Sequence, residues 1–245
     1  MLCVVGDNPS LVTQGLQPVQ TPHLDQAYEG EIDDLRAAIA RTGTRAEGMV
    51  RDAVRALLTR DTALARQVML TDRELDRLEL ELDRRCVTML ARRSPVGEDL
   101  RLILCALKAD VDMERMGDLA EHIAERAVEL ATGQGIEAVP ELQEMARRVV
   151  AVTERTFSAL STGNALEAQA CIAEDKLIDA LHGDILRRMI QIAKDHPDQL
   201  ERTLAWSSVS RHLERVADHA CNVAEMVVFL VEGRVMRHGG LKPQP

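Results

Sequence analysis

The sequence contains one motif twice, at a spacing of 100 residues, and both copies have the pattern of a helix. Residues 112–125 read DMERMGDLAEHIAE, and residues 212–225 read HLERVADHACNVAE. Each copy holds two acids four residues apart, which a helix places side by side on one face. These acids are Glu114 with Asp118, and Glu214 with Asp218. Because like charges at this spacing repel and weaken a helix, their recurrence indicates that both pairs have a function.

Composition favours packed helices over sheets. Of the 245 residues 46% are apolar but only 2% are aromatic, so Leu, Ala, Val, Ile and Met must fill the interior. Apolar residues recur at helical spacing and predict six helices, over about residues 24–59, 62–92, 96–131, 140–161, 165–195 and 197–232. Short connections make such helices antiparallel neighbours. The expected fold class is all-α, with two tandem three-helix bundles.

Proline and glycine divide the chain between these helices. Pro95 and Pro197 mark boundaries because proline lacks an amide donor and restricts the residue before it. The run TGQG at 132–135 separates two halves of the same plan. The expected domains are a disordered leader over residues 1–22, a first three-helix repeat over 23–135, a second over 136–233 and a flexible tail over 234–245.

Charge and cysteine content argue against several classes of protein. The formal net charge of −10 does not suit nucleic acid, whose phosphates require a basic surface. Five widely spaced cysteines without a C-x-x-C pair indicate reduced thiols in a cytoplasmic protein. The apolar runs are shorter than the roughly 18 residues that span a bilayer. No nucleotide-binding or nucleophile motif occurs in the sequence. We therefore expect a soluble, non-enzymatic protein without a transmembrane segment.

Two further acid pairs complete a pattern that suits metal binding. One pair lies in the second predicted helix, and the other at the matching place in the fifth. The eight candidate ligands are Asp72, Asp76, Glu114 and Asp118 in the first half, and Asp175, Asp179, Glu214 and Asp218 in the second. Facing carboxylates on neighbouring helices offer an oxygen-rich site for iron, manganese or magnesium, and for zinc.

Spacing alone is weak evidence, because 40 of the 245 residues are acidic and chance pairs are common. Glu79 with Asp83, for example, is interpreted as a solvated face. Arg115 and Arg215 could neutralise the motif acids without any metal. The histidines near the acid pairs are expected at the surface or at helix ends, and most cysteines in the core. These residues are His122, His182, His212 and His219, and Cys86, Cys105, Cys171 and Cys221.

The motif region resembles the signature of the PhoU family, bacterial regulators of phosphate uptake. The run ARRSPVGEDLRLILCALKADVDMERMGDLAEHIAERA, residues 91–127, carries the family's S-P-V-x-x-D-L-R-x-I segment and its D-x-E-R-x-G-D-x-A-x-x-I-A-E helix. The second copy matches at His212–Arg215, Asp218 and Asn222. The resemblance extends over about residues 24–235. It implies two three-helix bundles related by pseudo-twofold symmetry.

The resemblance also implies a site and a role. The E(D)xxxD motifs, which bind metal clusters in some members, fall on the same eight acids. Cys221 stands where the first copy has Glu121, so the two sites can differ in metal preference. The implied role is to connect a phosphate ABC transporter with a sensor histidine kinase, and to repress the starvation response when phosphate is plentiful. A homodimer and peripheral membrane association through partners are implied as well.

Two alternatives to a regulator remain open at this point. One is a metalloenzyme built on carboxylate-bridged metals, which would need an open coordination position and a nearby acid–base group. The other is a helical scaffold whose acids are only solvated. Metal content distinguishes the scaffold from the other two, and turnover distinguishes the enzyme from the regulator.

Overall fold

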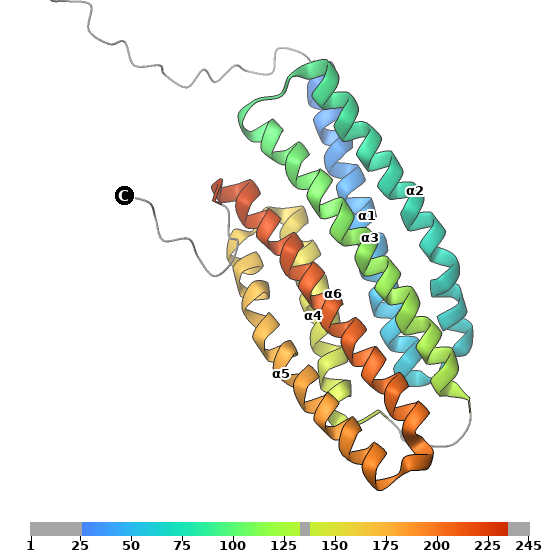
Figure 1. The fold of residues 1–245 in the computed structure, drawn as a ribbon. Coiled ribbons are helices and arrows are strands. Elements are labelled where there is room, and N and C mark those ends of the chain that lie inside the picture. Colours follow the sequence, from blue (N-terminus) through green and yellow to red (C-terminus); the bar gives the residue numbers. More distant parts are fainter. Residues whose placement is uncertain (1–25, 133–137, 235–245) are drawn as a thin grey trace, which may run out of the picture.

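Six long helices make up most of the chain that the structure describes. The structure is a computed structural model that describes residues 26–132 and 138–234. The helices are α1 (Gln26–Thr59), α2 (Thr62–Arg93), α3 (Gly97–Ala131), α4 (Pro140–Thr162), α5 (Ala165–Asp195) and α6 (Leu200–Glu232), with a short 3-10 helix η1 (Pro197–Gln199) before α6 (Figure 1). These bounds agree with the predicted helices to within a few residues. The predicted leader and the tail beyond Arg234 lie outside the described residues.

Local signals at helix ends explain several of these boundaries. Asp61 caps α2, since its carboxylate accepts hydrogen bonds from the backbone amides of Ala63 at 3.1 Å and Leu64 at 2.9 Å. Gly163 and Gly233 end α4 and α6 in the left-handed conformation, which glycine adopts without steric strain. The resulting connections are short, so consecutive helices run antiparallel.

The helices form two three-helix bundles that lie side by side. Helices α1–α3 make the first bundle and α4–α6 the second, with α3 and α6 adjacent at the centre and α2 and α5 at opposite outer edges (Figure 1). The bundles meet where α3 contacts α6 and where α1 contacts α4. Near one end of the central seam Cys105 Sγ lies 3.6 Å from the Met226 carbonyl oxygen, and near the other Arg202 donates to the Leu130 carbonyl at 2.8 Å. These contacts show that α3 and α6 are antiparallel. The expected fold class is confirmed.

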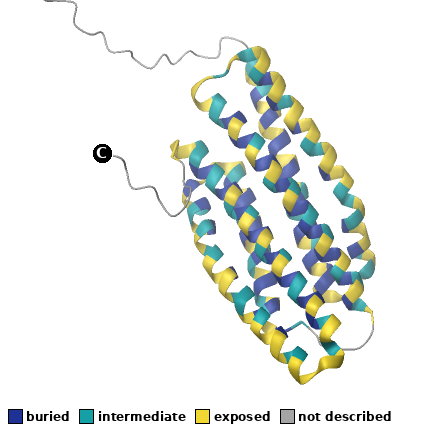
Figure 2. Cartoon of the chain, in the orientation of Figure 1, coloured by how far each residue is buried: buried dark blue, intermediate teal, exposed yellow. Residues whose placement is uncertain are grey.

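One continuous apolar core runs through both bundles. Buried positions follow the inward face of each helix (Figure 2). The two motif helices contribute to this core Met113, Met116, Ala120, Ile123 and Ala124 of α3, and Leu213, Val216, Ala220, Val223 and Ala224 of α6. Alanine at four of these positions lets the two backbones approach closely, and the aliphatic and methionine side chains fill the remaining space. Among the described helices, none combines the length and the apolar character that crossing a bilayer requires.

The cysteines of the described residues are free thiols. Cys86, Cys105 and Cys171 are buried, as predicted, whereas Cys221 is half-buried. Burial raises the pKa of Cys86 to about 12 and that of Cys105 to about 11. These two thiols therefore stay protonated at neutral pH and behave as small apolar core residues.

Gly117 lets α3 approach α2 closely beside the first motif. A β-carbon at this position would lie 2.2 Å from Cδ2 of Leu75 and 3.7 Å from Oδ1 of Asp72. Leu75 is only 1% exposed, so its side chain has little room to move. The second half has Ala217 at the equivalent position. The close approach is therefore particular to the first half, and it brings Asp72 near α3.

We predict that Gly117→Ala lowers the free energy of unfolding by about 1–2 kcal/mol, because displacing Leu75 outweighs the better helix propensity of alanine. Gly30→Ala is the matched control, since a β-carbon there meets nothing within 4 Å. It should raise the free energy of unfolding by about 0.5–1 kcal/mol. Urea denaturation followed by circular dichroism measures both values. Equal stabilisation by the two substitutions would contradict the packing at Gly117.

Candidate carboxylate metal site

The structure brings three predicted ligands of the second half together. One carboxylate oxygen from each of Asp175, Asp179 and Asp218 lies within 4.8 Å of the other two. Helix α5 supplies the first two acids from successive turns, and α6 supplies the third. This spacing lets one cation contact carboxylates from two helices. In residues 26–132 and 138–234, no other three side chains of ligand type come this close.

Crowding makes these acids harder to ionise. Burial raises the pKa of Asp218 to about 6, and neighbouring carboxylates, Glu214 first, add to the effect. Burial also raises the pKa of Glu214 and of Asp175. Within residues 26–132 and 138–234, Oδ1 of Asp175 is buried without a hydrogen-bond partner at ordinary distance, and the nearby Cys221 thiol lowers the pKa of this carboxylate only in part. Within the described residues, Arg215 forms no ion pair that could neutralise the group. A bound cation would relieve both the repulsion and the buried, unpaired oxygen.

The acids of the first half have a different electrostatic environment. Nη1 of Arg115 lies 3.0 Å from Oδ2 of Asp118, and its Nε lies 3.4 Å from Oε2 of Glu114. This arginine therefore balances part of the negative charge, as the sequence allowed. On α2, burial raises the pKa of Asp72, and the charges of Asp76 and Asp118 raise it further. The two halves thus carry the same four acids, but in the part of the chain that the structure describes only the first half pairs two of them with an arginine.

Asp110 extends the acidic stripe of the first half and was not predicted as a site residue. It lies one turn before Glu114 on α3, is 2% exposed, and its Oδ1 has no hydrogen-bond partner in the described residues. Burial raises the pKa of Asp110 to about 8, with further contributions from Glu79, Asp83 and Glu114. Asp83 is exposed, in agreement with a solvated face, but Glu79 is half-buried. The only signal in the sequence is the spacing of four residues between Asp110 and Glu114.

In the second half the equivalent positions are neutral. Ser210 replaces Asp110, and His182 replaces Glu79. His182 Nδ1 lies 2.7 Å from the hydroxyl oxygen of Ser210. A hydrogen bond between α5 and α6 thus stands where the first half places two acids. The extended acidic stripe is a property of the first half alone.

Polar contacts also cross the central seam between the motifs. Oδ1 of Asp112 lies 2.8 Å from Nδ1 of His219 and accepts a hydrogen bond from Asn222 at 2.9 Å. On the opposite side of the pseudo-twofold axis, the rings of His122 and His212 stack with centroids 5.3 Å apart. Burial lowers the pKa of His212 to about 4, so this ring is neutral at pH 7. His219 is therefore engaged with α3, although it follows a motif acid in sequence.

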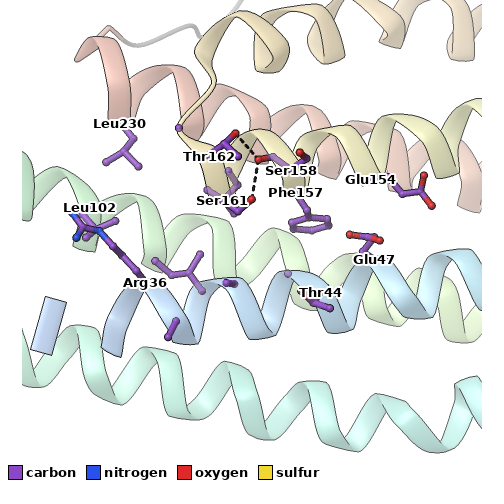
Figure 3. Close-up of a pocket in the computed structure, with 16 residues that line it drawn as sticks. Arg36, Thr44, Glu47, Leu102, Glu154, Phe157, Ser158, Ser161, Thr162 and Leu230 are labelled. Atoms are coloured by element: carbon purple, nitrogen blue, oxygen red, sulfur yellow. Dashed lines mark hydrogen bonds between the residues drawn. The ribbon is translucent and has the colours of Figure 1, made fainter. Parts of the chain in front are cut away.

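A cavity of about 870 Å³ lies away from these acids, where α1 meets α4. Figure 3 shows Glu47 of α1 on one side and Glu154 and Phe157 of α4 on the other, with Leu102 and Leu230 toward one end. Burial raises the pKa of Glu47, and the charge of Glu154 adds to it. No predicted ligand lines this cavity. The motif acids form a carboxylate surface between helices, distinct from this pocket.

The fold and the paired acids define an all-helical protein with two three-helix repeats, each of which presents carboxylates on adjacent helices. The model of the PhoU domain family matches residues 29–127 and 142–227. The chain therefore belongs to the PhoU family.

Relatives and solved structures agree with this assignment. The chain is 35% identical to the phosphate-specific transport system accessory protein PhoU homolog of Pseudomonas aeruginosa, covering 90% of this chain and 92% of that protein. It is 26% identical to the phosphate-specific transport system accessory protein PhoU of Escherichia coli, over 89% and 90% of the two chains. A crystal structure of PhoU from Pseudomonas aeruginosa superposes with a TM-score of 0.82 at 34% identity, over 84% of this chain and all of that one. A PhoU crystal structure from Streptococcus pneumoniae gives 0.78 at 22% identity, over 86% and 100%, and this supports the fold.

Asp110 should make stability depend on pH. Its pKa is about 8 in the folded chain and near 4 in an unfolded one, so folding retains a proton between these values. Stability therefore falls as the pH rises from about 4 to about 8. In metal-free protein, we expect the free energy of unfolding of Asp110→Asn to exceed that of wild type by about 3–4 kcal/mol more at pH 8 than at pH 5.

Urea denaturation at both pH values provides the measurement. Asp33→Asn, at an exposed acid on α1, is the control and should change stability equally at the two pH values. A stability difference between wild type and Asp110→Asn that does not vary with pH would show that Asp110 is ionised in the folded protein.

Proposed function

We propose that the protein regulates phosphate uptake and the response to phosphate starvation. Membership of the PhoU family carries this proposal, because the family model and the curated relatives match nearly all of the described chain. Those relatives are named accessory proteins of a phosphate-specific transport system. In the proposed role, the protein connects a phosphate ABC transporter to a sensor histidine kinase in the cytoplasm. It represses the response when phosphate is plentiful.

The proposed mechanism is binding to partners rather than a chemical reaction. A contact with the kinase would bias that enzyme toward its inactive or phosphatase state, and a contact with the transporter would report phosphate supply. Both require exposed surfaces that hold their shape, and the continuous core of the two bundles supports this requirement. A homodimer is part of the proposal and would present each surface twice.

We also propose that the eight motif acids bind metal ions. The fit is best in the second half, where three carboxylates converge. Within the described residues, one oxygen of Asp175 is buried without a hydrogen-bond partner. Arg211 and Arg215 lower the pKa of Glu214 by their charge, but Arg215 forms no ion pair with the group in the described residues. Oxygen ligands of this kind suit iron, manganese or magnesium, and zinc is a further candidate. A metal there would supply positive charge between α5 and α6. Its proposed effect is to order the acidic surface that partners meet.

The first measurement is the metal content of protein purified without a histidine tag. We expect stoichiometric metal in wild type, with separate losses in Glu114→Ala/Asp118→Ala and in Glu214→Ala/Asp218→Ala. Each double substitution removes two negative ligands from one half and leaves the other half intact. Glu98→Ala/Glu129→Ala, at two exposed acids of α3 outside the motifs, is the charge-matched control. Wild type that remains metal-free after reconstitution would exclude the metal sites while leaving the regulatory role open.

Arg115 should make the two sites differ in affinity. In the first half a cation must compete with the guanidinium for Asp118 and Glu114, so we expect weaker binding there than in the second half. Arg115→Ala should tighten binding in the first half, and Arg215→Ala should have a smaller effect because Arg215 forms no ion pair within the described residues. Calorimetric titration of each variant measures this. Equal changes in the two variants would argue against the Arg115 contacts.

The biological role is tested by deleting the gene in its host. At high phosphate we expect derepressed phosphate-responsive transcription and altered uptake, both restored by the wild-type copy. Complementation with the two acid-pair variants then shows whether repression requires the metal sites. Unchanged transcription and uptake in a strain without a second copy would refute the regulatory proposal.

A further inference from the structure

The outward face of α2 carries four arginines in a row. Arg66, Arg73, Arg77 and Arg84 are all exposed. A helix turns by 100° per residue, so the four side chains project within about 20° of one common direction. None of the four forms an ion pair within the part of the chain that the structure describes. We call these four residues the arginine stripe.

This arrangement is unusual for the molecule, whose net charge is −10. Other arginines nearby are paired: Arg45 with Glu74 at 2.6 Å, and Arg85 with Glu81 at 2.7 Å. Glu74 and Glu81 lie on the side of α2 that faces α1. The motif acids of α2 lie on the side that faces α3. At helical spacing, no acid of α2 lies within about 40° of the stripe. The four arginines therefore form no close ion pair within the described residues, although Glu31, Asp34 and Glu81 line the same hollow as Arg77 and Arg84.

Exposed apolar side chains accompany the stripe. Leu70 is 73% exposed and Leu80 is 53% exposed, and they lie on opposite sides of the stripe, each about 40° from its mean direction. Val87, 56% exposed, lies at the edge of the same face. Exposed apolar residues also occur on α5, where Leu166, Leu177 and Ile190 are 78%, 51% and 57% exposed. What distinguishes this side of α2 is that its apolar side chains lie beside arginines that form no ion pair within the described residues.

The second repeat has no comparable row of arginines on its equivalent helix, α5. On α5, aligned through the motif acids, the positions of the four arginines hold Gln169, Lys176, Ala180 and Arg187. Arg187 pairs with Asp184, one turn earlier. The equivalent side of the second bundle therefore offers at most one unpaired cation. The stripe is a feature of the first bundle alone.

We propose that the arginine stripe binds an anionic lipid surface. From Arg66 to Arg84 the stripe extends about 27 Å along a straight helix, and α2 lies at the outer edge of the molecule (Figure 1). A straight row of cations matches a plane of negative charge, and guanidinium groups bind phosphate oxygens in pairs. Leucines between the arginines reach past the headgroups into the acyl boundary.

The test is co-sedimentation of purified full-length protein with lipid vesicles. Wild type should bind vesicles that contain phosphatidylglycerol, should not bind vesicles of phosphatidylcholine alone, and should be released by salt. Arg66→Gln/Arg73→Gln/Arg77→Gln/Arg84→Gln should weaken binding by about fivefold for each arginine, and so by more than about 100-fold in total. Because these residues are exposed, the variant should keep the circular dichroism spectrum of wild type.

A matched control separates the stripe from net charge. Lys176→Gln/Arg187→Gln/Arg188→Gln/Lys194→Gln removes four exposed cations from α5 and should retain binding within about twofold. Equal losses in the two variants, or no binding of wild type at low salt, would overturn the proposal. Binding to polyglutamate but not to anionic vesicles would also overturn it and would assign the stripe to an acidic protein. The assay contains no partner protein, so its outcome is independent of the proposed role in phosphate regulation.

Discussion

The close packing of α3 against α6 is the contact on which the rest of the structure depends. Both copies of the repeated motif lie on these two helices, and their inward faces are almost entirely small or aliphatic. With this seam formed, Glu114 and Asp118 are turned toward α2, while Glu214 and Asp218 are turned toward α5. The apolar positions of the motif thus determine where its acids are presented. Packing and charge are encoded in the same stretch of sequence on different faces of the helix.

Helical periodicity was sufficient to predict the number, bounds and class of the helices, because long amphipathic stretches leave few alternatives. Short connections then led to the two bundles. Spacing also predicted which acids share a helix face, and the structure brings Asp175, Asp179 and Asp218 together as that spacing suggested. Whether the eight acids bind metal stays a prediction. The periodicity of the sequence therefore predicts the fold, whereas it predicts the arrangement of the site only in part.

What could not be predicted depends on contacts between helices. The burial of Asp110 results from the packing of α2 on α3, which no spacing within one helix specifies. Likewise, Arg115 and Arg215 occupy identical places in the repeat, yet within residues 26–132 and 138–234 only Arg115 forms ion pairs with its neighbouring acids. Gly117 is also visible in the sequence, but its close approach to Leu75 is not. Each case requires knowledge of which side chain from another helix fills the adjacent space.

The symmetry of the contact between α3 and α6 suggests how a chain with two repeats could have originated. Antiparallel helices related by a pseudo-twofold axis, with position 112 opposite 222 and 122 opposite 212, have the geometry of an isologous contact between two identical subunits. A single repeat on its own would leave the apolar side of its third helix uncovered, and self-association would be the simplest way to bury it. Fusion of two such subunits would have freed each half to diverge. The contact between Asp112 and Asn222 on one side of the axis, and the stacked histidines on the other, are places where the two halves differ.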